Sequence, residues 1–219
     1  MQIIPRRELP RLLRAAGLDP HTREFPDVPA VHRLTVRERE PRPHIRGPHR
    51  KIVYPDGRME GPIPVADRPA LSAFVAAAFT ALEVEAVLAV VAEGTFWLNN
   101  KAQAAYLAKV ADARYVCQFL RRRGLTDRFQ GGFCVRRARF SAVLPVLAAN
   151  TFAGGGDVLF AALSPVGRRL TILACHHYDL HFAAPDPAPL ESIADLAAQH
   201  GLEPETLALP DLPALWGSE

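Results

Sequence analysis

The segment from Asp157 to Phe182 constrains the fold of this chain most strongly. It contains two apolar runs of strand length, 158–160 and 170–173, that are rich in aliphatic and β-branched residues. Three consecutive glycines precede the first run, and a Ser-Pro-Val-Gly turn at 164–167 separates the two. The segment therefore predicts a buried β-hairpin.

The end of this segment carries a dense group of polar, chemically reactive side chains, and we expect the second strand to continue through it to Phe182. Because successive strand residues point to opposite faces, one face would carry Cys175, His177, Asp179 and His181. Histidines at this spacing can converge on one zinc ion, and a metal-bound water would suit hydrolysis. Surface or hydrogen-bonded histidines give the same pattern. A zinc-dependent hydrolase is therefore the alternative hypothesis.

Length and composition set the outer limits. With 219 residues, 49% of them apolar, the chain can bury a proper hydrophobic core. No apolar run reaches the roughly 20 residues needed to cross a bilayer, and the first residues lack the apolar region of a secretory signal. We therefore expect a cytoplasmic protein. Three widely spaced cysteines, Cys117, Cys134 and Cys175, fit reduced thiols.

Charge is distributed unevenly along the chain. Residues 1–140 hold 24 of the 26 lysines and arginines and 14 of the 23 acidic residues, which gives a net charge of +10. Residues 141–219 carry a net charge of −7, from 2 basic and 9 acidic residues. Such a gradient predicts a basic part that could meet a polyanion and an acidic part that would not. Solvated arginines on a helical surface would give the same count.

Two segments concentrate the positive charge. The irregular segment 41–64 combines cations with one aromatic residue, namely Arg42, Arg46, Arg50, Lys51 and Tyr54. The second segment runs from the last turn of a predicted long helix past a Gly-Gly turn, and holds Arg121, Arg122, Arg123, Arg136, Arg137 and Arg139. Arginines contact phosphates and an aromatic ring can stack on a base. The alternative for the first segment is a flexible arm that is exposed to solvent and binds no ligand. In the second segment, positive charge at the end of a helix complements the helix dipole, but this explains only some of the arginines.

The remaining pattern predicts an α+β fold with a mainly antiparallel sheet flanked by helices. We expect helices over 7–16, 69–82, 100–123, 140–151 and 190–200, strands over 31–38 and 133–135, and hairpins over 51–58 and 84–98. A helix followed by a hairpin occurs at 69–98 and again at 140–173, which suggests an internal duplication. Three segments follow: 1–66 with a helix and the basic irregular region, the α+β core 67–184, and the C-terminal helix and acidic tail 185–219.

The leading functional hypothesis is a non-catalytic nucleic-acid-binding protein, with DNA favoured over RNA. The tail carries Leu212, Leu215 and Trp216, which predicts a homo-oligomer contact or a protein partner there. No P-loop, nucleophile elbow or dinucleotide fingerprint is present, which argues against the common enzyme classes. No helix-turn-helix, zinc-finger or RNA-recognition signature is present either, so the sequence does not support base-specific readout.

Overall fold

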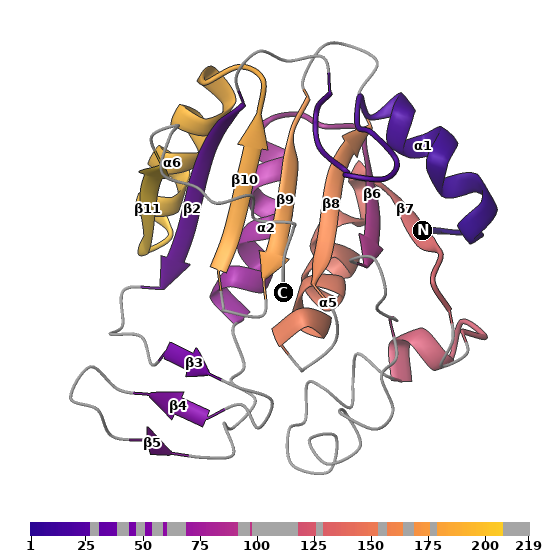
Figure 1. Ribbon diagram of the computed structural model, residues 1–219, viewed down its shortest axis with the longest axis horizontal. Helices are drawn as coiled ribbons and strands as arrows, with labels where there is room; N and C mark the ends of the chain where they lie inside the picture. Colours follow the sequence, from indigo (N-terminus) through magenta and orange to yellow (C-terminus); the bar gives the residue numbers. More distant parts are fainter. Residues whose placement is uncertain are drawn as a thin grey trace.

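The computed structural model has one large antiparallel sheet with helices on both faces (Figure 1). It describes residues 1–26, 31–38, 44–46, 51–53, 59–60, 69–91, 97, 118–125, 129–152, 157–163, 169–175 and 179–207. The eight strands lie in the order β1-β7-β6-β8-β9-β10-β2-β11. They are β1 (Gln2–Ile4), β2 (His32–Glu38), β6 (Ala86–Val91), β7 (Gly132–Arg136), β8 (Val158–Leu163), β9 (Thr171–Cys175), β10 (Asp179–Ala184) and β11 (Leu202–Leu207). The predicted α+β class is confirmed.

Three helices cover one face of the sheet: α2 (Pro69–Ala81), α5 (Phe140–Phe152) and α6 (Ala188–Gln199). The sequences of α2 and α5 are almost wholly apolar because each packs against both the sheet and the other helix. The rings of Phe79 in α2 and Phe140 in α5 lie 6.2 Å apart, and Phe74 meets Phe182 of β10 at 6.1 Å. Each fully buried ring contributes about 1.5–3 kcal/mol, so this layer holds the main core.

The opposite face is covered at one side by α1 (Leu9–Ala15), which follows a 3-10 turn, η1 (Arg6–Glu8). Leu9 and Leu13 are buried in a second core cluster with Leu88 of β6 and Leu159 of β8. The helix ends at Gly17, whose φ of 78° suits glycine. Among the described elements, no helix covers the same face over β10, β2 and β11.

The predicted hairpin is confirmed by the pairing of β8 with β9, from Val158 opposite Ala174 to Ala161 opposite Thr171. The expected continuation of that second strand to Phe182 is wrong. The strand ends at Cys175, and β10 returns antiparallel beside it with Asp179 opposite Cys175. A continuous strand would have run far past the six residues of β8 beside it and left its backbone groups without a ladder partner.

The predicted hairpin over 84–98 is also wrong, although its first strand exists as β6. That strand pairs with β7 on one edge and with β8 on the other, so neither edge is left for 95–98. Ladders with strands about 40 and 70 residues further along the chain replace the local turn. The proposed duplication, which relied on this hairpin, stays a prediction.

The other predicted elements follow the sequence closely. The helices over 7–16, 69–82, 140–151 and 190–200 and the strands over 31–38 and 133–135 are confirmed within a few residues. The small hairpin is present as β4 (Lys51–Val53) and β5 (Met59–Glu60), which form a separate sheet with β3 (His44–Arg46). Most of the helix predicted over 100–123 lies outside the described residues. Within the described part of the chain, no helix is long and apolar enough to span a bilayer.

The eight-stranded sheet draws strands from all three predicted segments. β1 and β2 come from 1–66, β11 comes from 185–219, and the other strands come from 67–184. Consequently β1, near the start of the chain, and β11, near its end, lie at opposite edges of one sheet.

Candidate functional site

The β1–β7 side of the sheet gathers most of the described arginines, and we call this set the basic edge. It consists of the arginines of η1 and α1, those at the helical turn before β7, and those directly after β7. They are Arg6, Arg7, Arg11, Arg14, Arg121, Arg122, Arg123, Arg136, Arg137 and Arg139. All of these side chains are exposed except that of Arg123, which is half-buried. The fold thus brings the second predicted arginine segment together with a helix from the start of the chain.

The arginines of the first helix form a stripe. Arg7, Arg11 and Arg14 are spaced by four and three residues, so they share the solvent side, while Leu9 and Leu13 face the sheet. The sequence predicted this helix, but its polar side was not counted as part of the site. The signal was present, because the same spacing that predicts the buried leucines also aligns the arginines.

The turn after β7 presents the next group of arginines. The strand ends at Arg136, and a 3-10 turn, η2 (Arg137–Arg139), leads into α5. The backbone N–H of Arg137 donates to the carbonyl of Glu85 at 2.8 Å, and its Nη2 lies 3.4 Å from the carbonyl of Thr80. These contacts fix the turn and leave the side chains of Arg136 and Arg139 exposed.

Arg123 is held by the protein itself. Its guanidinium carbon lies 3.5 Å from the ring centroid of Phe119, and its Nη1 donates to the Phe119 carbonyl at 2.8 Å. Positive charge at the last carbonyls of a helix is stabilising, so this residue has a sufficient structural role. Arg121 and Arg122 are exposed beside it, and Gly124 ends the turn with a φ of 74°.

The two groups of the second arginine segment flank β7 at its opposite ends. Residues 121–123 precede the strand, and Arg6 of η1 joins that end by donating from Nη1 to Gln130 Oε1 at 2.6 Å. Arg136 is the last residue of the strand and Arg137–Arg139 follow it. The strand spans roughly 14 Å at about 3.4 Å per residue. An extended polyanion lying along this edge could therefore reach both groups.

The opposite edge, formed by β11 and α6, is acidic. Its exposed carboxylates are Asp186, Glu191, Asp195, Glu203 and Glu205. Arg37 of β2 forms an ion pair with Glu205, and Arg33 of the same strand lies 4.0 Å from Glu24. The arginines of η1, α1 and the turn after β7 have no ion pair with any described carboxylate. The charge gradient along the sequence is thus also a separation across the molecule.

The first predicted segment is only partly described. Arg46 in β3 and Lys51 in β4 occupy directly opposed positions in the antiparallel pair. Arg42, Arg50 and Tyr54 lie outside the described residues. The structure therefore places two cationic positions of this segment side by side in the backbone register.

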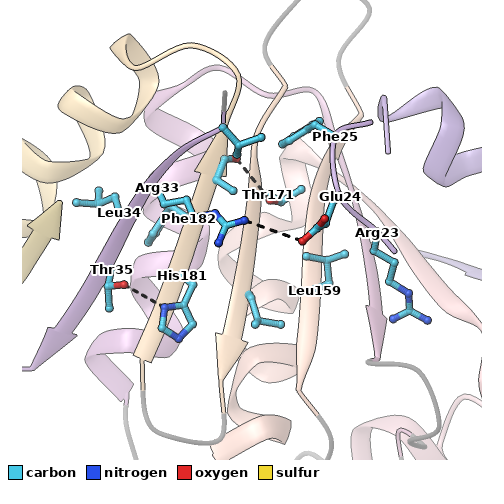
Figure 2. A pocket seen from close by; sticks show the side chains of 13 residues that line it. Arg23, Glu24, Phe25, Arg33, Leu34, Thr35, Leu159, Thr171, His181 and Phe182 are labelled. Atoms are coloured by element: carbon cyan, nitrogen blue, oxygen red, sulfur yellow. Dashed lines mark hydrogen bonds and ion pairs between the residues drawn. The ribbon is translucent and has the colours of Figure 1, made fainter. Parts of the chain in front are cut away.

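The predicted zinc ligands are only partly brought together. Cys175 and Asp179 are cross-strand neighbours, and both are buried. His181 is half-buried, and its Nδ1 lies 3.0 Å from Thr35 Oγ1 (Figure 2), which is a hydrogen-bonding role. His177 lies outside the described residues. In the described part of the chain, no three histidine, cysteine or acidic side chains come close enough to hold a metal ion.

Comparison with protein-family models, with characterised proteins and with solved structures finds no match. Functional reasoning for this chain therefore rests on the geometry and charge of the sites themselves.

Proposed function

We propose that this protein binds nucleic acid without catalysing a reaction, and that the arginines of the basic edge other than Arg123 contact the phosphates. The observation that carries the proposal is the gathering of exposed arginines at the β1–β7 side, where those of η1, α1 and the turn after β7 have no ion pair with a described carboxylate. Crowded like charges repel one another in the free protein. A polyanion relieves that repulsion and gains affinity by releasing its counterions.

Duplex DNA fits this surface better than an unpaired strand. Proteins that bind single strands use aromatic side chains on which successive bases stack. Among the described residues, Ile3 is the one exposed large hydrophobic side chain, and the basic edge offers no exposed aromatic ring there. Affinity would then come from phosphate contacts, which carry no direct sequence information.

The segment around β3 and β4 extends the proposed interface. Directly opposed cations, such as those at Arg46 and Lys51, destabilise an antiparallel pair unless an anion is shared between them. Arg42 and Arg50 would add phosphate contacts, and Tyr54 would stack on a base at an unpaired end of the duplex. The acidic edge would repel the same polyanion, so nucleic acid would approach from one side. The C-terminal tail remains the proposed contact for self-association or a protein partner.

The test is a binding titration with labelled duplex DNA, single-stranded DNA and duplex RNA of one sequence, across a salt series. We expect log K to fall linearly with log salt, with a slope of about −0.9 for each phosphate contact on duplex DNA. Duplex DNA should bind most tightly, and a scrambled sequence should bind equally well. Absence of binding at low salt, or an affinity that does not depend on salt, would refute the proposal.

A further inference from the structure

A small pocket lies on the opposite face of the sheet from α2, α5 and α6, beside the loop that follows α1. Its volume is about 90 Å³, and it is lined by side chains from β2, β8, β9 and β10 and by residues 23–25 of the loop (Figure 2). The loop is held in place locally. The Asp19 carboxylate accepts from the N–H groups of His21 and Thr22 at 2.8 Å each, and the Asp19 N–H donates to the Glu24 carbonyl at 2.8 Å.

The pocket has an apolar part and a polar part. Leu159, Leu173 and Phe25 supply hydrocarbon surface, and all three belong to the second core cluster. Arg33 and Glu24 supply opposite charges, and Arg23, whose Nη1 donates to the Val91 carbonyl, also lines the pocket. Figure 2 shows the side chain of Arg33 reaching across the strands towards Glu24. A ligand seated here would meet hydrocarbon on one side and charge on the other.

The polar groups of the pocket are not equally engaged. Thr35 and His181 pair with each other at 3.0 Å, and the Thr171 hydroxyl donates to the Ala183 carbonyl at 3.4 Å. Arg33 lies 4.0 Å from the Glu24 carboxylate, which is beyond the 2.7–3.2 Å of an N–H···O hydrogen bond. Among the described residues, the Arg33 side chain has no closer polar partner, although a guanidinium offers five donors.

We propose that this pocket binds a small organic carboxylate. The carboxylate would take two parallel hydrogen bonds from Arg33, which is the geometry that a guanidinium favours. The hydrocarbon part would rest on Leu159 and Leu173. Glu24 competes with the ligand for the same cation, so ligand binding displaces its side chain. This side chain has 43% of its surface exposed, against 22% for Arg33, and can therefore turn towards solvent.

Butyrate is a suitable probe because it combines a carboxylate with a three-carbon chain. Calorimetric titration should show butyrate binding roughly tenfold more tightly than butanamide, which has the same shape without the charge. Acetate should bind more weakly than butyrate, because it lacks the two methylenes that would contact the leucines. Amide chemical shifts should change in β2, β9 and β10.

Variants of two residues make the test specific. Glu24→Gln removes the competing charge and should tighten butyrate binding about two- to fivefold, whereas Arg33→Gln should abolish the preference for butyrate over butanamide. Arg37→Gln is the matched control, because it removes the same charge from the same strand outside the pocket. Equal affinity for butyrate and butanamide, or unchanged or weaker butyrate binding by Glu24→Gln, would overturn the proposal even if the Arg33 variant failed to fold.

Discussion

Replacing Arg136 and Arg139 together by glutamine tests the basic edge most directly. Both side chains are exposed after β7, so their removal should leave the fold intact. Each phosphate contact contributes about 0.9 to the slope of log K against log salt for duplex DNA, so losing two should reduce its magnitude by about 1.8. At about 0.1 M salt, one logarithmic unit below 1 M, this corresponds to roughly 60-fold weaker binding.

The assay is fluorescence anisotropy with a labelled duplex at several salt concentrations, with thermal unfolding as a check on folding. A matched double variant, Arg33→Gln with Arg37→Gln, changes the net charge equally but lies on β2, beside the acidic edge. It should keep the wild-type slope. If both double variants lower the slope equally, net charge alone explains binding and the proposed role of the basic edge is refuted. It is also refuted if neither variant lowers the slope.

Four further variants or conditions probe the structure of the protein. Arg123→Met should lower the free energy of unfolding by about 1–2 kcal/mol, because it loses the ring contact and the carbonyl hydrogen bond, yet change DNA affinity less than twofold. Gly132→Ala should destabilise by about 1–3 kcal/mol in denaturant unfolding, because its Cβ would lie 2.8 Å from the Ala89 carbonyl oxygen. Hydrogen bonds from the backbone N–H groups of Thr22 and His21 hold the pKa of Asp19 below its ordinary value of 3.8. The stability that these bonds give the folded loop is therefore fully present above pH 3.8. It is lost as the pH falls through the folded-state pKa, and amide exchange in the loop should then accelerate. Burial raises the pKa of Cys134 while the charge of Arg136 opposes the rise, so Arg136→Gln should slow alkylation of this thiol at pH 8.

The sequence predicts those elements whose signal is local. The apolar helices and the β8–β9 hairpin carry their periodicity and turn residues within a short window, and they form as expected. β1 and β11 are different. β1 has three residues, and β11 contains Pro204 and two exposed glutamates, Glu203 and Glu205. Both become strands only because a partner strand is presented to them, so a single-sequence pattern cannot reveal them.

The sequence also does not predict which strands β6 pairs with, for a related reason. The segment 84–98 contains a plausible local turn. However, pairing with β7 and β8 is more favourable for β6 than pairing within a short hairpin. Both of those ladders place buried side chains such as Val87 and Phe160 inside the main core. Burial of such residues outweighs the entropic cost of closing the longer loops, which grows only slowly with loop length.

The candidate site illustrates a different limit. Arg123 and Arg122 are adjacent and identical in type, yet one is folded onto Phe119 and the other is exposed. Composition cannot separate an arginine that stabilises the protein from one that is available to a ligand. Conversely, Arg7, Arg11 and Arg14 were not predicted as part of the site. They are far in sequence from the predicted arginine segment and reach the same edge only through the fold.

The difference between arginines with and without carboxylate partners is the strongest physical argument for a polyanionic ligand. The sheet carries Arg37, from the basic part of the sequence, to the acidic edge, where it pairs with Glu205, while Arg33 of the same strand lies 4.0 Å from Glu24 in the loop after α1. The arginines of α1 and of the turn after β7 receive no carboxylate partner from the described part of the chain. A set of exposed positive charges without carboxylate partners is what a phosphate-binding role requires.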